Sequence, residues 1–474
     1  MKTRKKTKIV ATLGPAVSTK EKIKELMIAG VNVFRVNFSH ADYEDVKTKI
    51  KYIRELNKEN NYNVAVLADL QGPKLRVGVM EDGVHLNEGD EFTFTTEKCT
   101  GTKEKAFMTY QNFPKDVEKG ENILIDDGKL LFEVIDTDRD STVIAKVLRG
   151  GSLKSKKGVN LPNTNISLPA LTEKDIKDAK FAIEQEVDWM ALSFVRTPED
   201  LVKLSDLIKE KSSYKIPIIA KIEKPEAINN INHLTSYCDG IMVARGDLGV
   251  EIPMQKVPII QKMLVRKAKE ARIPVIIATQ MMESMITSQI PTRAEVNDVA
   301  NSIMDGADAV MLSGETSVGE YPADVIKAMR SIIVSVEDSE LIEGYVQGVN
   351  CINERYISKA VCSNAAKLAD EIEAAAITTL TNSGYTAFQI SARRPKSNIL
   401  AFSDNPRILA QLNLLWGVKA QYYDRMVSTD ETVEDLNRIT LERNYAKKGD
   451  FVINLTSMPV HDKGMVNTLR VSQI

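Results

Sequence analysis

Acidic and basic side chains that could hold a metal and an anionic substrate follow apolar segments of this chain. Lys221 and Glu223 stand two residues apart at the end of IPIIAKIE, and Asp247 follows GIMVARG. Two carboxylates from neighbouring strand ends can bind one Mg²⁺ or Mn²⁺ and leave positions open for substrate oxygens. A lysine beside that metal would place positive charge on a transferring phosphoryl group or a developing enolate. A structural salt bridge between Lys221 and Glu223 is the alternative.

The segment VFRVNFSH carries a second group of polar side chains. Arg35, Asn37 and Ser39 alternate along a stretch that we expect to be extended, so they share one face, and His40 follows them. A guanidinium and a carboxamide that point inward at a buried strand end need charged or polar partners. We therefore expect them to contact an anion or a cation. A polar rim that is merely solvated is the alternative.

A turn rich in small residues could bind a carboxylate or a phosphate. The residues ARGDLG at 244–249 lie where a strand meets a helix, so the backbone N–H groups at Gly246 and Asp247 are candidate donors. Thr279, at the end of PVIIAT, would add a hydroxyl to that anion site, although a residue that only caps its strand fits equally well.

Eight apolar segments place these groups, and each is rich in Val, Ile, Ala and Leu on both faces. Such segments are typical of strands covered by helices, and charged helical stretches lie between most of them. Eight β-α units predict a (β/α)8 TIM barrel, in which reacting groups sit where strands end. The segments are KIVATLG (8–14), VFRVNFSH (33–40), VAVLADL (64–70), WMALSF (189–194), IPIIAKIE (216–223), GIMVARGD (240–247), PVIIATQ (274–280) and AVMLSGE (309–315).

The sequence predicts that the barrel is interrupted and then followed by a further domain. Residues 72–168 are rich in Gly and Thr and in alternating patterns such as EFTFTT, which are hairpin signals. We expect an all-β lid domain inserted between barrel segments 1–71 and 169–341. From about residue 342 to 474, strands and helices alternate again, with a helix at 359–372 and strands at 375–381, 398–403 and 450–456. This pattern predicts a C-terminal α/β domain.

Composition excludes several classes of function. The net charge of −2 and the lack of a basic, aromatic-rich stripe argue against binding nucleic acid. The cationic start MKTRKKTK is followed by only IVATL, too short for a signal peptide, and no segment is long enough to cross a membrane. The four cysteines have no CxxC spacing. We expect a cytoplasmic protein whose metal, if any, is bound by oxygen atoms.

Several long motifs resemble the signature segments of the pyruvate kinase family, in order and over essentially the whole chain. They are TKIVATLGP, FRVNFSH, KIEKPEAI, MVARGDLGVEIP, ATQMMESM, PTRAEVNDVAN and DGADAVMLSGETSVGEYP. The resemblance implies a glycolytic enzyme that transfers the phosphoryl group of phosphoenolpyruvate to ADP and releases pyruvate and ATP.

The resemblance assigns the groups around phosphoenolpyruvate. Glu223 and Asp247 match the residues that hold Mg²⁺, and Lys221 matches the lysine that stabilises the phosphoryl group and the enolate. The backbone at Gly246 and Asp247, with Thr279, would receive the substrate carboxylate. Thr279 would also lie near the site of enolate protonation, and Arg35 would contact the transferring phosphoryl group.

The resemblance also implies nucleotide contacts. Asn37, His40, Arg76 and Lys157 match positions that contact ADP and ATP. Arg76 and Lys157 would arrive from the lid, so lid closure would complete the site and exclude water.

One departure from the common family pattern concerns a potassium ion. Many members bind K⁺ through groups that match Asn37, Ser39, Asp69 and the backbone of Leu70, next to a glutamate, but here that last position holds Lys74. The lysine ammonium can take the volume and the charge of the ion, and K⁺ beside it would be repelled. We expect an enzyme that does not require K⁺. A solvated Lys74 at the lid hinge is the alternative.

In the C-terminal domain, TNSGYT follows a strand and precedes a helix. It resembles the phosphate loop of the family's allosteric site, with residues 456–468 as the facing loop, and a helix-capping turn without a ligand is the alternative. The candidate effector residues are Thr381, Asn382, Ser383, Gly384 and Thr386. The resemblance also implies a homotetramer.

Two other classes of function remain open at this point. A metal-dependent lyase or aldolase that acts on a pyruvate enolate could use the same carboxylates and metal, but it would not need Arg76, Lys157 or a nucleotide. A non-catalytic sugar-phosphate sensor could bind an effector in the C-terminal domain, although the intact residues Lys221, Glu223 and Asp247 argue against an inactive barrel. Formation of ATP and pyruvate from phosphoenolpyruvate and ADP separates the three.

Overall fold

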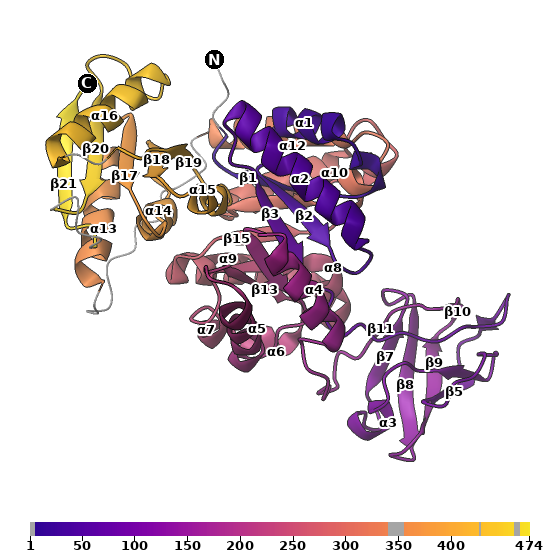
Figure 1. The fold of residues 1–474 in the computed structure, drawn as a ribbon. Coiled ribbons are helices and arrows are strands. Elements are labelled where there is room, and N and C mark those ends of the chain that lie inside the picture. Colours follow the sequence, from indigo (N-terminus) through magenta and orange to yellow (C-terminus); the bar gives the residue numbers. More distant parts are fainter. Residues whose placement is uncertain (1–4, 340–354, 426–427, 459–464) are drawn as a thin grey trace.

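The computed structural model describes residues 5–339, 355–425, 428–458 and 465–474, and it contains three units (Figure 1). A barrel lies in the middle, an all-β domain projects from one end of it, and an α/β domain lies against the other end. The predicted fold class is confirmed.

Eight parallel strands close the barrel in the order β1-β16-β15-β14-β13-β12-β3-β2. The strands are β1 (Lys8–Thr12), β2 (Val33–Asn37), β3 (Ala65–Asp69), β12 (Trp189–Leu192), β13 (Ile218–Ile222), β14 (Gly240–Ala244), β15 (Val275–Ala278) and β16 (Ala309–Leu312). Each predicted segment contains one of these strands, and Arg35, Asn37, Asp69 and Lys221 lie within them, but several strands stop before the last polar residue of the predicted segment. Glu223, Asp247 and Thr279 therefore lie in the loops and helix starts that follow.

Alternate residues of each strand face two different cores. In β3, Val66 and Ala68 pack with the surrounding helices, whereas Ala65 and Leu67 belong to a second cluster that fills the barrel interior. Both sets are fully buried, which explains why the segments are apolar on both faces.

Helices surround the barrel, and several begin at residues that satisfy free backbone N–H groups. Thr172 and Asp175 form a capping box at α4, and Thr292 and Glu295 form another at α10. The α-helices of this unit are α1 (Lys20–Ala29), α2 (Tyr43–Asn60), α4 (Glu173–Glu184), α5 (Pro198–Lys211), α6 (Pro225–Asn229), α7 (Ile231–Leu234), α8 (Arg245–Glu251), α9 (Val257–Ala271), α10 (Arg293–Met304), α11 (Gly314–Ser317) and α12 (Pro322–Glu337). Short 3-10 helices occupy Pro15–Val17, Met254–Lys256 and Glu283–Ile286.

The chain leaves the barrel after β3, forms the inserted domain, and returns to the barrel before α4. The main sheet of this domain has the order β11-β7-β8-β9-β5-β6, and β4 pairs with β10 in a two-stranded sheet. The strands are β4 (His85–Leu86), β5 (Glu91–Thr95), β6 (Lys105–Phe107), β7 (Asn122–Ile125), β8 (Leu130–Thr137), β9 (Thr142–Arg149), β10 (Gly151–Ser152) and β11 (Val159–Asn160), with one short helix, α3 (Phe113–Asp116). Phe92, Phe94 and Phe132 meet in its separate core.

The C-terminal domain has a five-stranded sheet in the order β19-β18-β17-β20-β21, in which only β21 is antiparallel. The predicted strands and helix are present as β17 (Ala376–Leu380), β18 (Asn398–Ser403), β20 (Phe451–Thr456) and α13 (Tyr356–Glu371). We did not predict the two edge strands, β19 (Val418–Tyr422) and β21 (Thr468–Gln473). The other helices are α14 (Tyr385–Ser391), α15 (Pro406–Leu412) and α16 (Thr429–Glu442).

The C-terminal domain covers the end of the barrel where the strands begin. The indole N–H of Trp189, the first residue of β12, donates to the carbonyl of Gln411 in α15 at 3.1 Å. Arg394 pairs with the buried Asp308 at 3.1 Å, just before β16. The strands therefore end on the opposite side, which faces the β domain (Figure 1).

In the described ranges, no helix is long and apolar enough to span a membrane. Cys99, Cys238 and Cys362 are free thiols, and Cys351 lies outside the described residues.

Candidate active site

The predicted polar groups continue the inward-facing rows of the barrel strands. Arg35 follows Val33 in the same row of β2, Asp69 follows Leu67 in β3, and Lys221 follows Ile219 in β13. Since side chains alternate along a strand, all three point into the barrel mouth, where the strands end.

Asp69 joins two of the predicted cationic groups. Its Oδ2 atom accepts a hydrogen bond from Nε of Arg35 at 2.6 Å, and its Oδ1 atom lies 3.2 Å from Nζ of Lys221. Burial raises the pKa of Asp69, but the charges of Lys221 and Arg35 outweigh that effect and hold the pKa below its ordinary value. Asp69 is therefore ionised and fixes the two cations relative to each other.

Lys221 lies at the centre of the site. Its ammonium is 3.0 Å from Oε1 of Glu223 and donates to the hydroxyl of Ser193 at 2.7 Å. Burial lowers the pKa of Lys221, but the negative charges of Asp69 and Glu223 more than offset this effect and raise the pKa above its usual value. The site thus contains a buried and permanently charged ammonium. The salt bridge between Lys221 and Glu223 that we considered as an alternative is present, and it is compatible with a chemical role for Lys221.

Glu223 and Asp247 form the carboxylate pair that was predicted to hold the metal. Glu223 is buried, and its Oε2 atom accepts from the backbone N–H of Phe194 at 2.8 Å. Burial raises the pKa of Glu223, the charge of Lys221 lowers it, and the negative charge of Asp247 raises it again, so that the net shift is upward. Carboxylate oxygens from Glu223 and Asp247 are a suitable donor set for a hard divalent cation.

The described residues contain no group of three or more His, Cys, Asp or Glu side chains arranged to hold a metal. Two carboxylates with positions left for substrate oxygens are typical of Mg²⁺ sites that bind phosphorylated substrates. The oxygen donors of Glu223 and Asp247 have the chemistry that such a site needs.

Gly246 and Thr279, predicted to receive an anion, contact each other. The N–H of Gly246, in the first turn of α8, donates to the Thr279 hydroxyl at 2.7 Å, and that hydroxyl donates to the carbonyl of Ala278 at 2.5 Å. A side chain at Gly246 would begin 3.3 Å from the Thr279 oxygen, so glycine keeps this approach open. Thr279 has a φ of +70°, a strained conformation for a β-branched residue that costs about 1–3 kcal/mol. Such strain is common at functional sites.

The residues after β2 are not all extended, as we had expected. The strand ends at Asn37, and the side-chain oxygen of Asn37 accepts the backbone N–H of Ser39 at 3.2 Å. Ser39 therefore lies in a turn, and His40 beside it is exposed. The prediction that Arg35, Asn37 and Ser39 share one strand face is wrong at Ser39, because the Asn37 side chain turns the backbone.

The two cationic residues of the β domain are engaged within that domain. Arg76 donates to the carbonyl of Lys156 at 2.8 Å, and Lys157 pairs with Asp126 at 2.7 Å. The structure therefore does not bring them into contact with Asn37 or His40. They lie on the domain that faces the barrel mouth.

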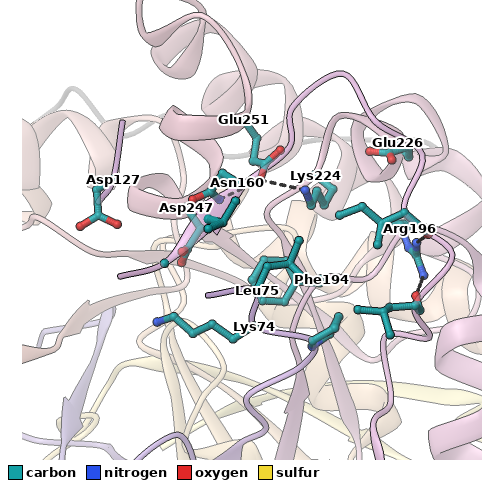
Figure 2. Close-up of a pocket in the computed structure, with 15 residues that line it drawn as sticks. Lys74, Leu75, Asp127, Asn160, Phe194, Arg196, Lys224, Glu226, Asp247 and Glu251 are labelled. Carbon is teal, nitrogen blue, oxygen red and sulfur yellow. Dashed lines mark hydrogen bonds and ion pairs between the residues drawn. The ribbon is translucent and has the colours of Figure 1, made fainter. Parts of the chain in front are cut away.

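Lys74 lies at the junction between the barrel and the β domain. It lines a pocket together with Asp247, and its side chain is exposed (Figure 2). Among the described residues, no ion pair or hydrogen bond holds its ammonium group, and Asp69 is neutralised by Arg35 and Lys221 instead. The carbonyl of Leu70 accepts the Ser193 hydroxyl at 2.6 Å.

The candidate effector loop lies between β17 and α14. The Thr381 hydroxyl accepts the N–H of Gly384 at 2.9 Å and so closes the turn that precedes α14. Gly384 has a φ of +78°, Asn382 and Ser383 are exposed, and Thr386 is buried in α14. Part of the facing loop, residues 459–464, lies outside the described residues.

Sequence reasoning missed two residues that hold the central groups. Ser193 binds Lys221, and the backbone N–H of Phe194 binds Glu223. Both follow directly after β12, in the segment WMALSF. The signal was available, because Ser193 is a polar residue directly after an apolar segment, like the residues that had been considered.

The fold and this site define an enzyme on a (β/α)8 barrel, with buried cations and carboxylates where the strands end. Comparison with family models identifies the family within that class. One described as pyruvate kinase, barrel domain, matches residues 4–326, and one described as pyruvate kinase, alpha/beta domain, matches residues 359–472. The chain therefore belongs to the pyruvate kinase family.

Comparisons with individual proteins support the same family. Pyruvate kinase from Staphylococcus saprophyticus is 41% identical over 98% of this chain and 80% of the relative, and that from Mycobacterium tuberculosis is 40% identical over 98% of both chains. A crystal structure of a pyruvate kinase from Cryptosporidium parvum has a TM-score of 0.92 at 33% identity, and it covers 99% of this chain and 96% of that one. Pyruvate kinases are phosphotransferases that act on phosphoenolpyruvate and ADP, and this chain is an enzyme of that class rather than a lyase or a sensor.

Proposed function

We propose that this enzyme transfers the phosphoryl group of phosphoenolpyruvate to ADP and yields ATP and pyruvate, as a step of glycolysis in the cytoplasm. The cluster of Asp69, Lys221 and Glu223 at the barrel mouth carries the proposal, because it combines a fixed ammonium with a carboxylate suited to Mg²⁺. The chemistry needs positive charge around a phosphoryl group in transfer, and little else from the protein.

Lys221 is proposed as the catalytic cation. Its raised pKa keeps it charged, and its three neighbours hold the ammonium in one place. A fixed charge stabilises the transferring phosphoryl group and the enolate without reorganisation. Arg35, fixed by Asp69, contacts the same phosphoryl group.

Glu223 and Asp247 are proposed to hold Mg²⁺, or Mn²⁺ in its place. The bound ion would neutralise phosphoryl and enolate oxygens. The N–H groups of Gly246 and Asp247 and the hydroxyl of Thr279 receive the substrate carboxylate, for which the present bond between Gly246 and Thr279 has to open. The Thr279 hydroxyl then lies beside the enolate carbon that takes a proton.

The inserted domain is proposed to act as a lid. Asn37 and His40 on the barrel and Arg76 and Lys157 on the lid would contact the nucleotide. Lys157 and Arg76 must exchange their present partners for phosphate oxygens when the lid closes. Closure would also exclude water from the transfer step. We propose 1–71 and 169–341 for the barrel, 72–168 for the lid and 342–474 for the C-terminal domain, although residue 342 lies outside the described residues.

We further propose that the enzyme does not need potassium. Asn37, Ser39, Asp69 and the carbonyl of Leu70 would form the site, and Lys74 would supply the positive charge. The ammonium of Lys74, which has no partner in the part of the chain that the structure describes, supports this proposal, because lid movement can carry it toward Asp69 without breaking a contact seen there.

The C-terminal domain is proposed to bind a phosphorylated metabolite at Thr381, Asn382, Ser383, Gly384 and Thr386 and to activate the enzyme allosterically. The two exposed residues of the loop, Asn382 and Ser383, support a site open to solvent. We also propose a homotetramer, on the resemblance to the family.

The function is tested by incubating the purified protein with Mg²⁺, phosphoenolpyruvate and ADP and by measuring ATP and pyruvate separately. Equal amounts of both products are expected. Pyruvate with inorganic phosphate in place of ATP would contradict phosphoryl transfer to the nucleotide.

A further inference from the structure

Three side chains meet where the inserted β domain rests on the barrel. Glu251, the last residue of α8, accepts hydrogen bonds at the same Oε1 atom from Lys224 and from Asn160, each at 2.8 Å. Lys224 and Glu251 belong to the barrel, whereas Asn160 belongs to β11 of the β domain. Figure 2 shows Asn160 and Lys224 beside the Glu251 carboxylate.

Each member of this junction is close in the chain to a residue with a proposed role in the reaction. Lys224 follows Glu223 directly, and Glu251 lies one helical turn after Asp247 in α8. Asn160 lies three residues after Lys157. The junction therefore connects the strand next to a nucleotide-binding residue with the two segments that carry the metal ligands.

The charged groups of this contact are buried. Glu251 is only 3% exposed and Lys224 only 6%, so each needs the other for charge neutrality. Asn160 adds a neutral donor to a carboxylate that is already paired, and among the described residues the second oxygen of Glu251 has no hydrogen-bond partner. A negative charge in place of Asn160 would face the buried carboxylate of Glu251.

The junction lies close to the two chain connections between the domains. Its pocket is also lined by Leu75, shortly after the chain enters the β domain, and by Ile166 and Leu168, where the chain leaves it. Arg196 of the barrel donates to the carbonyl groups of Ile166 and Leu168. A contact beside the connections can persist while the distant part of the domain swings.

We propose that Glu251 is a positioning residue that serves as the pivot of the lid. Through Asn160 it holds β11 so that Lys157 reaches the nucleotide. Because Glu251 and Asp247 lie on the same helix, α8, this contact also fixes the position of β11 relative to Asp247. The inference rests on the proposed function, because it assigns the junction to the nucleotide step of that reaction.

The test compares Asn160→Asp with Asn163→Asp, which makes the same change at an exposed lid residue three positions away. Like charges brought together at a buried site are strongly disfavoured, so Asn160→Asp is expected to raise the KM for ADP about tenfold or more. It should also speed amide hydrogen exchange in the 155–168 peptide, where the N–H of Val159 bonds to Leu75. The control should change neither quantity.

Two results would overturn the pivot. One is equal behaviour of both variants in exchange and in KM. The other is a lower KM for ADP in Asn160→Asp, which would mean that the contact restrains closure. Asn160→Ala, which removes the donor without adding charge, is expected to change both quantities in the same direction by a smaller factor. The exchange comparison needs no turnover, so a wild type that made no ATP would refute the proposed function and still leave the junction tested.

Discussion

The ammonium of Lys221 donates to the hydroxyl of Ser193 at 2.7 Å, and that hydroxyl donates in turn to the carbonyl of Leu70 at 2.6 Å. The single hydroxyl proton is therefore directed away from Lys221, and an oxygen lone pair faces the ammonium. Ser193 is only 1% exposed, so water cannot easily replace it. The central cation is thus positioned by an uncharged residue that ties β13 to β12 and β3.

Ser193→Ala should lower kcat by about 10- to 100-fold, because a hydrogen bond to a charged group contributes about 1.5–3 kcal/mol. The KM for phosphoenolpyruvate should change less than kcat. Steady-state kinetics check this, with Ser302→Ala as the control. Ser302 is equally buried, and within the described residues its hydroxyl has no partner. Similar losses of kcat in both variants would show a general effect of removing a buried serine hydroxyl.

Asp247→Asn should weaken activation by Mg²⁺. A carboxamide is a poorer ligand than a carboxylate for this ion, and even changes to groups that support a ligand commonly cost 10- to 100-fold in affinity, so we expect at least about a tenfold rise in the Mg²⁺ concentration for half-maximal rate. Titration of the initial rate against Mg²⁺ measures it. Asp206→Asn, on the surface of α5, serves as the control, and an unchanged midpoint in Asp247→Asn would remove this residue from the metal site.

A phosphorylated metabolite should raise the melting temperature and lower the apparent KM for phosphoenolpyruvate. The coupling between such sites is typically about 1–3 kcal/mol. A thermal-shift screen of sugar phosphates and nucleoside monophosphates is the measurement, with Ser383→Asp as the variant whose added charge blocks the loop. If no compound shifts the melting temperature of the wild type, the loop serves only as the turn before α14 that the bond between Thr381 and Gly384 closes.

Potassium should have little effect on the wild type. In buffers with Mg²⁺ and tetramethylammonium as the only other cation, the rate should be near its maximum, and added K⁺ should act only by screening. Lys74→Glu should be inactive without K⁺ and partly restored by it, whereas Lys154→Glu, at another exposed lysine of the lid, should behave like the wild type. A wild type that is inactive until K⁺ is added would establish Lys74 as a solvated hinge residue.

The barrel was predictable because burial on both faces leaves a plain trace in the sequence. Leu67 and Ala68, for example, face different cores, and both are fully buried. The edge strands β19 and β21 left no such trace. In β21, the only apolar residues are Leu469 and Val471, and Val471 is exposed, so the strand lacks the long apolar run of a buried strand.

The charged members of the site were predictable from their places after apolar segments, whereas their partners were not. Asp69 was expected to contact a monovalent cation, and in the structure it pairs with Arg35 and Lys221. Which side chains meet across a barrel mouth depends on how far each one reaches, and Asp69 at the end of β3 contacts Lys221 on β13, two strands away. Contacts of the lid, such as that of Asn160 with Glu251, join residues that are 91 positions apart, and no local sequence pattern predicts them.

The role of Lys221 is the central claim, and Lys221→Met tests it most directly. Methionine has a similar length and no charge, so the loss should fall on the transition state. With Mg²⁺, phosphoenolpyruvate and ADP, kcat is predicted to fall by about 100- to 1,000-fold or more, while binding of phosphoenolpyruvate stays within about tenfold. A variant that keeps its kcat and shows only a raised KM would contradict the account, because Lys221 would then merely bind the substrate.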